Sequence, residues 1–416
     1  MKLLKEHKIY KKYYFNLIIS AYLLYTFSIA IKMVYSAQIV EIGPYYGVDK
    51  AELSLGLTIY YLIYAVSQLL ISGVVKKINL RYFIAITTIL SGLTFGSIVF
   101  LSKLWQVWLV LGINGVLQIG IWGGTMSIFG KYLPDYMTTG VTQLMSSGMA
   151  VGTFLAYGFS ALFTTILNWK YTFLFFGILT VLTAIYFFVA EKSIEANVGK
   201  VSINRSTVKV SIEKENRNKG NSFVFVFLSL MGILSLLACT TYYSLTNWVP
   251  SLLKEVHNVP SSYSMLISLL IPVGVFFGPF FSTYLCQKNK NYFFVGIPMM
   301  LISGVCALTM VFVYDVHILV AIIIPLVILF VSRGYTNVLL SYVPLKMRNV
   351  VETGKSSLIL NAFGSLSAAI TPFLSATLME NYGWEMFFAF LSVICCLCIV
   401  LLLIGSIWQK KKNFFQ

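Results

Sequence analysis

The stretch Phe15-Asn-Leu-Ile-Ile-Ser-Ala-Tyr-Leu-Leu-Tyr-Thr-Phe-Ser-Ile-Ala-Ile-Lys32-Met-Val-Tyr-Ser-Ala-Gln38 decides the fold. It lies in an apolar run over about 14–40, and ~20 apolar residues are enough for a helix to cross a bilayer. Lys32 lies well inside this run, where a charge costs several kcal/mol unless it faces water, a counter-ion or a ligand. Other polar or aromatic residues recur around it at helical spacing: Tyr25, Ser28, Tyr35 and Ser36. The run therefore predicts a membrane helix with one polar face that lines a pathway.

The composition indicates a protein with many membrane spans. Of the 416 residues, 58% are hydrophobic and 11% are charged, whereas soluble domains carry about 25% charged residues. The six cysteines lie in or at the end of apolar runs, so we interpret them as packing residues and not as metal ligands. The sequence lacks the motifs of serine hydrolases, zinc proteases and phosphate-binding loops. We therefore expect no enzyme activity, no cofactor and no bound metal.

Apolar runs separated by charged or Pro/Gly turns predict an all-α membrane protein with twelve transmembrane helices. The runs lie at about 14–40, 52–75, 82–101, 105–130, 139–166, 169–190, 223–252, 261–286, 292–313, 316–344, 355–379 and 384–407. Residues 191–222 are polar and have no apolar periodicity, which is typical of a soluble linker. The chain thus divides into an N-terminal six-helix half (1–190), a cytoplasmic linker (191–222) and a C-terminal six-helix half with a short basic tail (223–416).

The basic residues predict the orientation. Most of the 30 Lys and Arg residues fall on the side that carries the linker and both termini, and cytoplasmic loops are enriched in these residues. We therefore expect both termini to be cytoplasmic in a multi-pass protein of the cell membrane. The net charge of +16 then reflects topology and contact with anionic lipids, not nucleic-acid binding. We expect the chain to act as a monomer.

The acidic residues single out two cations. None of the 14 Asp and Glu residues lies deep in a predicted span, and Glu41, at the end of the first span, comes closest. Lys32 in the first span and Arg333 in the tenth therefore have no evident carboxylate partner in the membrane. Unpaired cations in a low dielectric are costly, and a bound anion would relieve that cost.

The arrangement and two local motifs resemble a known family. Two six-helix halves joined by a basic linker are typical of the major facilitator superfamily, whose halves are related repeats. Asn114-Gly115-Val-Leu-Gln118-Ile-Gly-Ile-Trp122 in the fourth span resembles a motif of its organophosphate:phosphate antiporters, the glycerol-3-phosphate and hexose-phosphate transporters. Asn247-Trp248-Val-Pro250-Ser-Leu-Leu253-Lys254-Glu255-Val256 at the end of the seventh span is similar to a second motif. The resemblance implies that Lys32 falls, within one residue, where that family carries the first arginine of its phosphate site.

The sequence departs from that family at three points. The family's second phosphate-binding arginine falls near Tyr242, and its fifth-span histidine has no counterpart, because all three histidines lie outside the spans or at their edges. The acidic residue that the superfamily carries in the loop after the second span is missing from Ser72-Gly-Val-Val-Lys76-Lys77-Ile-Asn79-Leu-Arg81. These departures concern the substrate and leave the implied fold unchanged.

We predict that Lys32 and Arg333, one from each half, bind the substrate. The planar guanidinium of Arg holds two oxygens of a carboxylate or phosphate at once, whereas Lys supplies a point charge. In the alternative interpretation, Arg333 donates to backbone carbonyls between helices and Lys32 extends to the membrane surface. The other candidate substrate-binding residues are polar or aromatic side chains of the predicted cavity: Tyr35, Tyr64, Gln68, Gln118, Tyr242, Asn247, Asn337 and Asn361.

The sequence thus favours a secondary transporter of a small organic anion, an organophosphate or a carboxylate, that works by alternating access. Anion exchange is favoured over proton symport because no Asp, Glu or His lies deep in a predicted span to carry a proton. One alternative is a membrane-embedded sensor that binds a ligand without transporting it. Another is a proton-coupled solute or drug transporter of the same superfamily.

Overall fold

The computed structural model describes residues 2–72, 78–198, 221–289, 292–343 and 353–412. Every regular element within these ranges is a helix, which confirms the prediction of an all-helical protein. The N-terminal half contains α1 (Lys2–Tyr46), α2 (Lys50–Ser72), α3 (Leu80–Gly96), η2 (Ser97–Phe100), α4 (Leu104–Leu117), α5 (Ile121–Tyr132), α6 (Asp135–Ile166) and α7 (Tyr171–Val198). The C-terminal half contains α9 (Asn221–His257), α10 (Ser261–Ile267), η3 (Ser268–Leu270), α11 (Ile271–Lys288), α12 (Tyr292–Val313), α13 (Ile318–Asn337), η4 (Val338–Tyr342) and α15 (Thr353–Lys412).

Ten helices in the described ranges are long and apolar enough to cross a membrane. The last of them, Ile359–Ile407, holds both the eleventh and the twelfth predicted spans, which meet at Gly383. The backbone of Gly383 is not helical, and its φ of 80° is a conformation that favours glycine. The helix α2 occupies the second predicted span but is not among the ten. A helix or a pair of helices therefore lies at each of the twelve predicted positions, while the orientation in the membrane stays a prediction.

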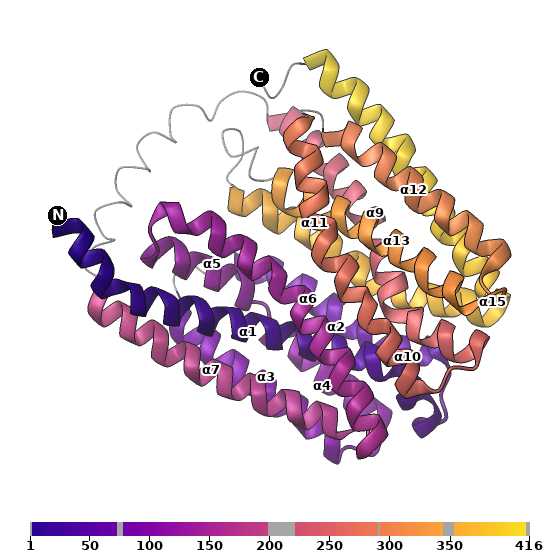
Figure 1. The fold of residues 1–416 in the computed structure, drawn as a ribbon, viewed down its shortest axis with the longest axis horizontal. Helices are drawn as coiled ribbons and strands as arrows, with labels where there is room; N and C mark the ends of the chain where they lie inside the picture. The colour runs from indigo at the N-terminus through magenta and orange to yellow at the C-terminus, as the bar shows by residue number, and fades with distance from the viewer. Residues whose placement is uncertain (1, 73–77, 199–220, 290–291, 344–352, 413–416) are drawn as a thin grey trace.

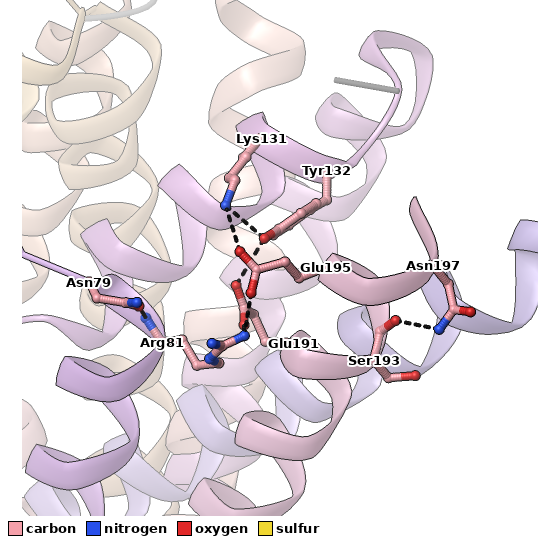
Figure 2. A network of polar contacts seen from close by, with 8 residues as sticks. All are labelled: Asn79, Arg81, Lys131, Tyr132, Glu191, Ser193, Glu195 and Asn197. Carbon is pink, nitrogen blue, oxygen red and sulfur yellow. Dashed lines mark hydrogen bonds and ion pairs between the residues drawn. The ribbon is translucent and has the colours of Figure 1, made fainter. Parts of the chain in front are cut away.

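The predicted linker begins later than the sequence indicated. The helix α7 continues to Val198, because Glu191 and Glu195 in its last turns are anchored by neighbouring helices (Figure 2). The Nη1 atom of Arg81, at the start of α3, lies 3.0 Å from Oε2 of Glu191 and also contacts Glu195. The hydroxyl of Tyr132, at the end of α5, donates to Glu191 over 3.2 Å. These contacts join α3, α5 and α7 at one end of the N-terminal half. Of the rest of the predicted linker, 199–220 lies outside the described residues and 221–222 belong to α9.

The packing of the core shows how the two halves are joined. One buried apolar cluster contains residues of both halves, including 29–42 of α1 and 242–253 of α9. The other two clusters each lie within one half, around 14–24 of α1 and around 227–238 of α9. The halves therefore share a core at the end away from the termini and have separate cores at the end that carries them (Figure 1).

Charged and polar contacts join the two halves at the end where they share a core, which we call the shared end. We call Lys50, Glu255 and Glu380 the charged latch. The Nζ atom of Lys50, at the start of α2, lies 2.5 Å from Oε2 of Glu255 in α9. The backbone N–H groups of Lys50 and Ala51 donate to Oε1 of Glu380 in α15, over 2.5 Å and 3.0 Å. Glu380 thus places a negative charge at the N-terminus of α2, where the helix dipole favours it. Trp384 donates from Nε1 to the same Glu255 over 3.3 Å.

Glycines let helices within a half approach closely. A Cβ atom built on Gly177 of α7 would lie 2.6 Å from the carbonyl oxygen of Gly92 in α3, and a Cβ built on Gly92 would lie 2.6 Å from the carbonyl oxygen of Gly177. Such small-residue contacts are the usual way for membrane helices to pack tightly. This packing favours movement of the N-terminal half as one unit if the two halves rock against each other.

We expect Gly177→Ala to destabilise the protein, because the new methyl group would collide with backbone that cannot turn away. Gly130→Ala is the matched control, since Gly130 is also helical and nothing lies within 4 Å of an added Cβ. Alanine in a helix is intrinsically better than glycine by about 1 kcal/mol, so the control should be neutral or stabilising. The melting temperature in detergent measures both, and an unchanged value for Gly177→Ala would contradict the close packing of α3 and α7.

We expect Glu255→Gln and Glu380→Gln to open the shared end, because each removes a charge from the latch. Lys50 and Glu255 are 22% and 38% exposed, and an ion pair of that exposure contributes no more than about 1 kcal/mol. Each single change should therefore shift the equilibrium between the closed and open forms of the shared end less than about tenfold, and the double change should shift it further.

Distances between spin labels at Glu52 and Asn381, on either side of the latch, measure this shift. Both positions are exposed. Lys103→Gln is the control, because it removes an exposed cation near the same end that forms no ion pair with the described residues. A double variant with the wild-type distance distribution would show that the latch does not hold the end closed.

Candidate functional site

Lys32 points its ammonium group at a tyrosine of the neighbouring helix. Its Nζ atom lies 4.5 Å from the centre of the Tyr64 ring in α2. Its side chain is partly exposed, although Ile31 and Met33 beside it in α1 are buried. No carboxylate of the described residues forms an ion pair with Lys32. The ring face is thus its charge partner, and such a contact contributes about 0.5 to 2 kcal/mol.

Arg333 is held in a similar way in the other half. Its guanidinium carbon lies 5.3 Å from the centre of the Tyr242 ring in α9. Its Nη2 atom donates over 2.9 Å to the sulfur of Met149, in α6 of the N-terminal half, and a thioether is a weak acceptor. Its Nε atom is buried without a hydrogen-bond partner. Within the described ranges Arg333 has neither a carboxylate nor a backbone carbonyl as acceptor, so it lacks the contacts that the alternative interpretation predicts.

A continuous series of tyrosine rings connects the two cations, and we call it the tyrosine bridge. It runs from Tyr64, under Lys32, through Tyr60 and Tyr61 of α2 to Tyr243 and Tyr242 of α9, under Arg333. Successive ring centres along this series are 6.0, 5.0, 5.7 and 5.0 Å apart. These separations are typical of favourable aromatic pairs. The contact between Tyr61 and Tyr243 joins the two halves of the protein.

Two of the predicted site residues, Gln118 and Gln68, form hydrogen bonds with tyrosines of the bridge. A third, Tyr35, holds the helix that carries three of those tyrosines. The Oε1 atom of Gln118 accepts from the hydroxyl of Tyr60 over 3.1 Å, and its Nε2 atom donates to Ser91 over 3.1 Å. The Nε2 atom of Gln68 donates to the hydroxyl of Tyr64 over 3.0 Å. The hydroxyl of Tyr35 donates to a carbonyl oxygen at the start of α2 over 2.8 Å. Gln118 and Gln68 thus orient rings of the bridge, and Tyr35 fixes α2 against α1.

The three predicted asparagines are placed differently. The side-chain oxygen of Asn247 accepts from the hydroxyl of Ser36 across the two halves over 2.9 Å, and its Nδ2 atom is buried without a partner. Asn337 lies one turn after Arg333 and is partly buried, with Nδ2 3.5 Å from the hydroxyl of Thr283. Asn361 is partly buried and forms no hydrogen bond with the other described side chains. Asn337 therefore shares α13 with Arg333 and contacts α11, whereas Asn247 joins the halves next to the shared core.

A family model described as Major Facilitator Superfamily matches residues 15–352. The chain belongs to this superfamily. The protein is therefore a secondary transporter that works by alternating access and spans a membrane several times; it is not an enzyme. The matching model describes the superfamily as a whole.

Two solved structures with the superfamily fold are similar to this transporter. Both show a bacterial homologue of the human lysosomal transporter Spinster, one in an inward-facing and occupied conformation and one in an inward-facing and unoccupied conformation. The first is 13% identical, covers 97% of each chain and has a TM-score of 0.70. The second is 15% identical, covers 95% of each chain and has a TM-score of 0.65. No curated protein sequence matches the chain.

Sequence reasoning missed most of the tyrosine bridge and the acceptor of Arg333. Tyr60 lies one helical turn before Tyr64, and Tyr243 lies beside Tyr242, so both were visible near predicted residues. Only Tyr64 and Tyr242 were selected as substrate-binding residues, and Tyr61 was not considered. Met149 gave no signal, because methionine is common in apolar spans and its contact with Arg333 depends on how α6 and α13 cross. The transporter thus builds its cationic site from rings as much as from the polar groups that were predicted.

Proposed function

We propose that this transporter carries a small organic anion, an organophosphate or a carboxylate, that binds between Lys32 and Arg333. The observation that carries the proposal is the pair of cations, one from each half, with only tyrosine rings as charge partners in the described residues. A site that attracts negative charge is the simplest use of such a pair.

The energies favour a ligand over a purely structural role. A charge left unpaired in a membrane costs at least about 2.5 kcal/mol, and more where water cannot reach it. A ring contact of the kind made by Lys32 and Arg333 contributes about 0.5 to 2 kcal/mol, so the rings compensate only part of the cost. An anion on either cation would compensate the remainder.

Unused hydrogen-bond donors lie next to Arg333. The Nε atom of Arg333 and the hydroxyl of Tyr242 are both buried and both without a partner, although the two side chains are in contact. Buried donors are rarely left unpaired, because each costs about 1 to 3 kcal/mol. An anionic group bound at Arg333 would offer acceptor oxygens in the same place.

The position of Arg333 also accounts for one departure from the organophosphate:phosphate antiporters. Tyr242 stands near the place where that family carries its second phosphate-binding arginine, and the guanidinium of Arg333 lies over the Tyr242 ring. The positive charge is thus supplied from α13 to a position beside α9. This different origin of the positive charge supports a related anion site. The choice between phosphate and carboxylate is left to experiment.

The proposed orientation gives the structure a place in the transport cycle. We place both termini and the linker in the cytoplasm of a cell, as the basic residues indicate. The shared core and the charged latch then close the outer end of the protein, and the separate cores lie at the cytoplasmic end. This arrangement supports an inward-facing state, and the two similar structures are also described as inward-facing. A single chain contributes both cations, in keeping with a monomeric transporter.

We expect anion exchange in place of proton symport. Among the described residues, no carboxylate or histidine that could carry a proton forms an ion pair or hydrogen bond with Lys32 or Arg333. Reconstituted vesicles preloaded with phosphate or a carboxylate should therefore take up labelled anion much faster than empty vesicles. Strong uptake into empty vesicles, driven by a pH gradient alone, would contradict exchange.

Changes at the two cations test the anion site. Lys32→Gln and Arg333→Gln should abolish anion binding and leave thermal stability unchanged or higher, because each removes a costly charge. Arg333→Lys should lower affinity at least tenfold, ~1.4 kcal/mol, because it keeps the charge but loses the two-oxygen fork. Lys32→Arg should be milder, because it replaces a point charge with another cation. Melting temperature and anion affinity are measured on the same purified variants.

Lys170→Gln is the matched control for these variants. The Nζ atom of Lys170 lies 4.2 Å from the ring of Tyr45, a contact of the same kind outside the proposed site. The control should bind anions like the wild-type protein. Normal anion binding by Arg333→Gln, together with a lower melting temperature, would show instead that Arg333 has a structural role.

A further inference from the structure

The two halves of the protein meet within the tyrosine bridge at Tyr61 and Tyr243, and we call this pair the joint. It lies between the two cations along the bridge. Tyr61 and Tyr243 meet there with ring centres 5.7 Å apart and ring planes tilted by 53°. Two further rings lead from Tyr61 to Lys32, and one leads from Tyr243 to Arg333. Tyr61 is buried, whereas Tyr243 is only partly buried and keeps part of its surface open. An anion held by either cation therefore has aromatic surface within reach of its body.

Two of the three tyrosine hydroxyls in the α2 part of the bridge are hydrogen-bonded within the protein. The hydroxyl of Tyr60 is used by Gln118, and the hydroxyl of Tyr64 is used by Gln68. Gln118 in turn is satisfied by Ser91. A sugar or other polyol needs a partner for each of its hydroxyls, and a missing partner is expensive. The hydroxyls of Tyr60 and Tyr64 are thus already used, and what these two residues offer to a ligand is mainly ring surface.

We propose that the transported anion carries an aryl group or a similarly flat apolar body, which packs against Tyr243 and Tyr61 while its acid group binds Arg333. This inference rests on the proposed anion site and narrows its substrate class. Aromatic pairs gain free energy beyond the area that they bury, and they favour offset or edge-to-face geometry with centres 4.5–7 Å apart. A third ring at the joint would extend the bridge in that geometry.

The charges at the two ends of the bridge decide between an anion and a cation. Clusters of aromatic rings also bind organic cations, because ring faces attract positive charge. Here Lys32 and Arg333 already occupy ring faces at both ends, and no carboxylate of the described residues forms an ion pair with either. A further cation would be repelled by both, so the arrangement selects a flat body that carries negative charge.

Matched pairs of anions test the inference on the purified wild-type protein. Phenyl phosphate is compared with glycerol 3-phosphate, and phenylacetate with acetate, by the rise in melting temperature at increasing ligand concentration. The aryl member of each pair should bind at least tenfold more tightly. Equal affinity within both pairs, or a preference for glycerol 3-phosphate, would overturn the inference and leave the anion site standing.

Variants of the joint show where the preference arises. Tyr61→Leu and Tyr243→Leu should each weaken the binding of phenyl phosphate at least threefold more than they weaken the binding of glycerol 3-phosphate. Tyr61→Phe and Tyr243→Phe keep the rings and should keep the preference. Tyr263→Leu, which changes an exposed tyrosine of α10, is the control. If the Phe variants lose the preference as the Leu variants do, the preference depends on the hydroxyl groups and not on the rings. That result would overturn the aryl inference.

The outcomes for the two proposals are distinct. If none of the four anions binds, or if all bind equally well to Arg333→Gln, the anion site itself is wrong and the aryl inference falls with it. If all four anions bind to the wild-type protein and none to Arg333→Gln, the anion site stands. The ratio of the two affinities within each pair then decides only the aryl inference. A tighter complex with phenyltrimethylammonium than with phenylacetate would overturn both.

Discussion

The constraint on which this structure depends is the placement of two positive charges among membrane helices without an acidic partner in the described residues. Lys32 and Arg333 would each destabilise the protein by several kcal/mol if nothing compensated them. The chain compensates them with tyrosine rings, Tyr64 in one half and Tyr242 in the other. A ring attracts a cation but cannot neutralise it, because the ring carries no net charge. The site therefore stays electrostatically incomplete, and the proposed anion would complete it.

The division of the core explains how such a site can be opened to one side at a time. The helices α1 and α9 each take part in two clusters, one shared between the halves and one confined to a single half. Within the N-terminal half, contacts such as those of Gly92 with Gly177 and of Arg81 with Glu191 hold the helices together. Between the halves, the charged latch is partly exposed and contributes little energy for each bond. The halves are therefore joined at one end by the shared core and the latch and have separate cores at the other end, which favours movement of the halves as units.

The sequence was sufficient for features that depend on local composition and was insufficient for those that depend on helix crossing. The length of the apolar runs and the isolation of Lys32 and Arg333 among them predicted the helical membrane fold and the two cations. The extension of α7 to Val198 was not predicted, because Glu191 and Glu195 look like linker charges until Arg81 is placed against them. The bridge was missed for a related reason. A tyrosine in a membrane span is more often an interfacial or packing residue, and only the crossing of α2 and α9 brings Tyr61 to Tyr243.

An incomplete site has an advantage over one that carries its own carboxylate. If a fixed acid neutralised Lys32 and Arg333, the two cations would be satisfied in every conformation, and a ligand would have to displace that acid to bind. Here the two cations come from different halves, so one anion interacts with both only when the halves hold them close together. A ligand shifts a conformational equilibrium by the difference between its affinities for the two states. If the substrate is the proposed anion, the charge that the protein leaves uncompensated would allow substrate binding to influence how α1 and α2 pack against α9 and α13.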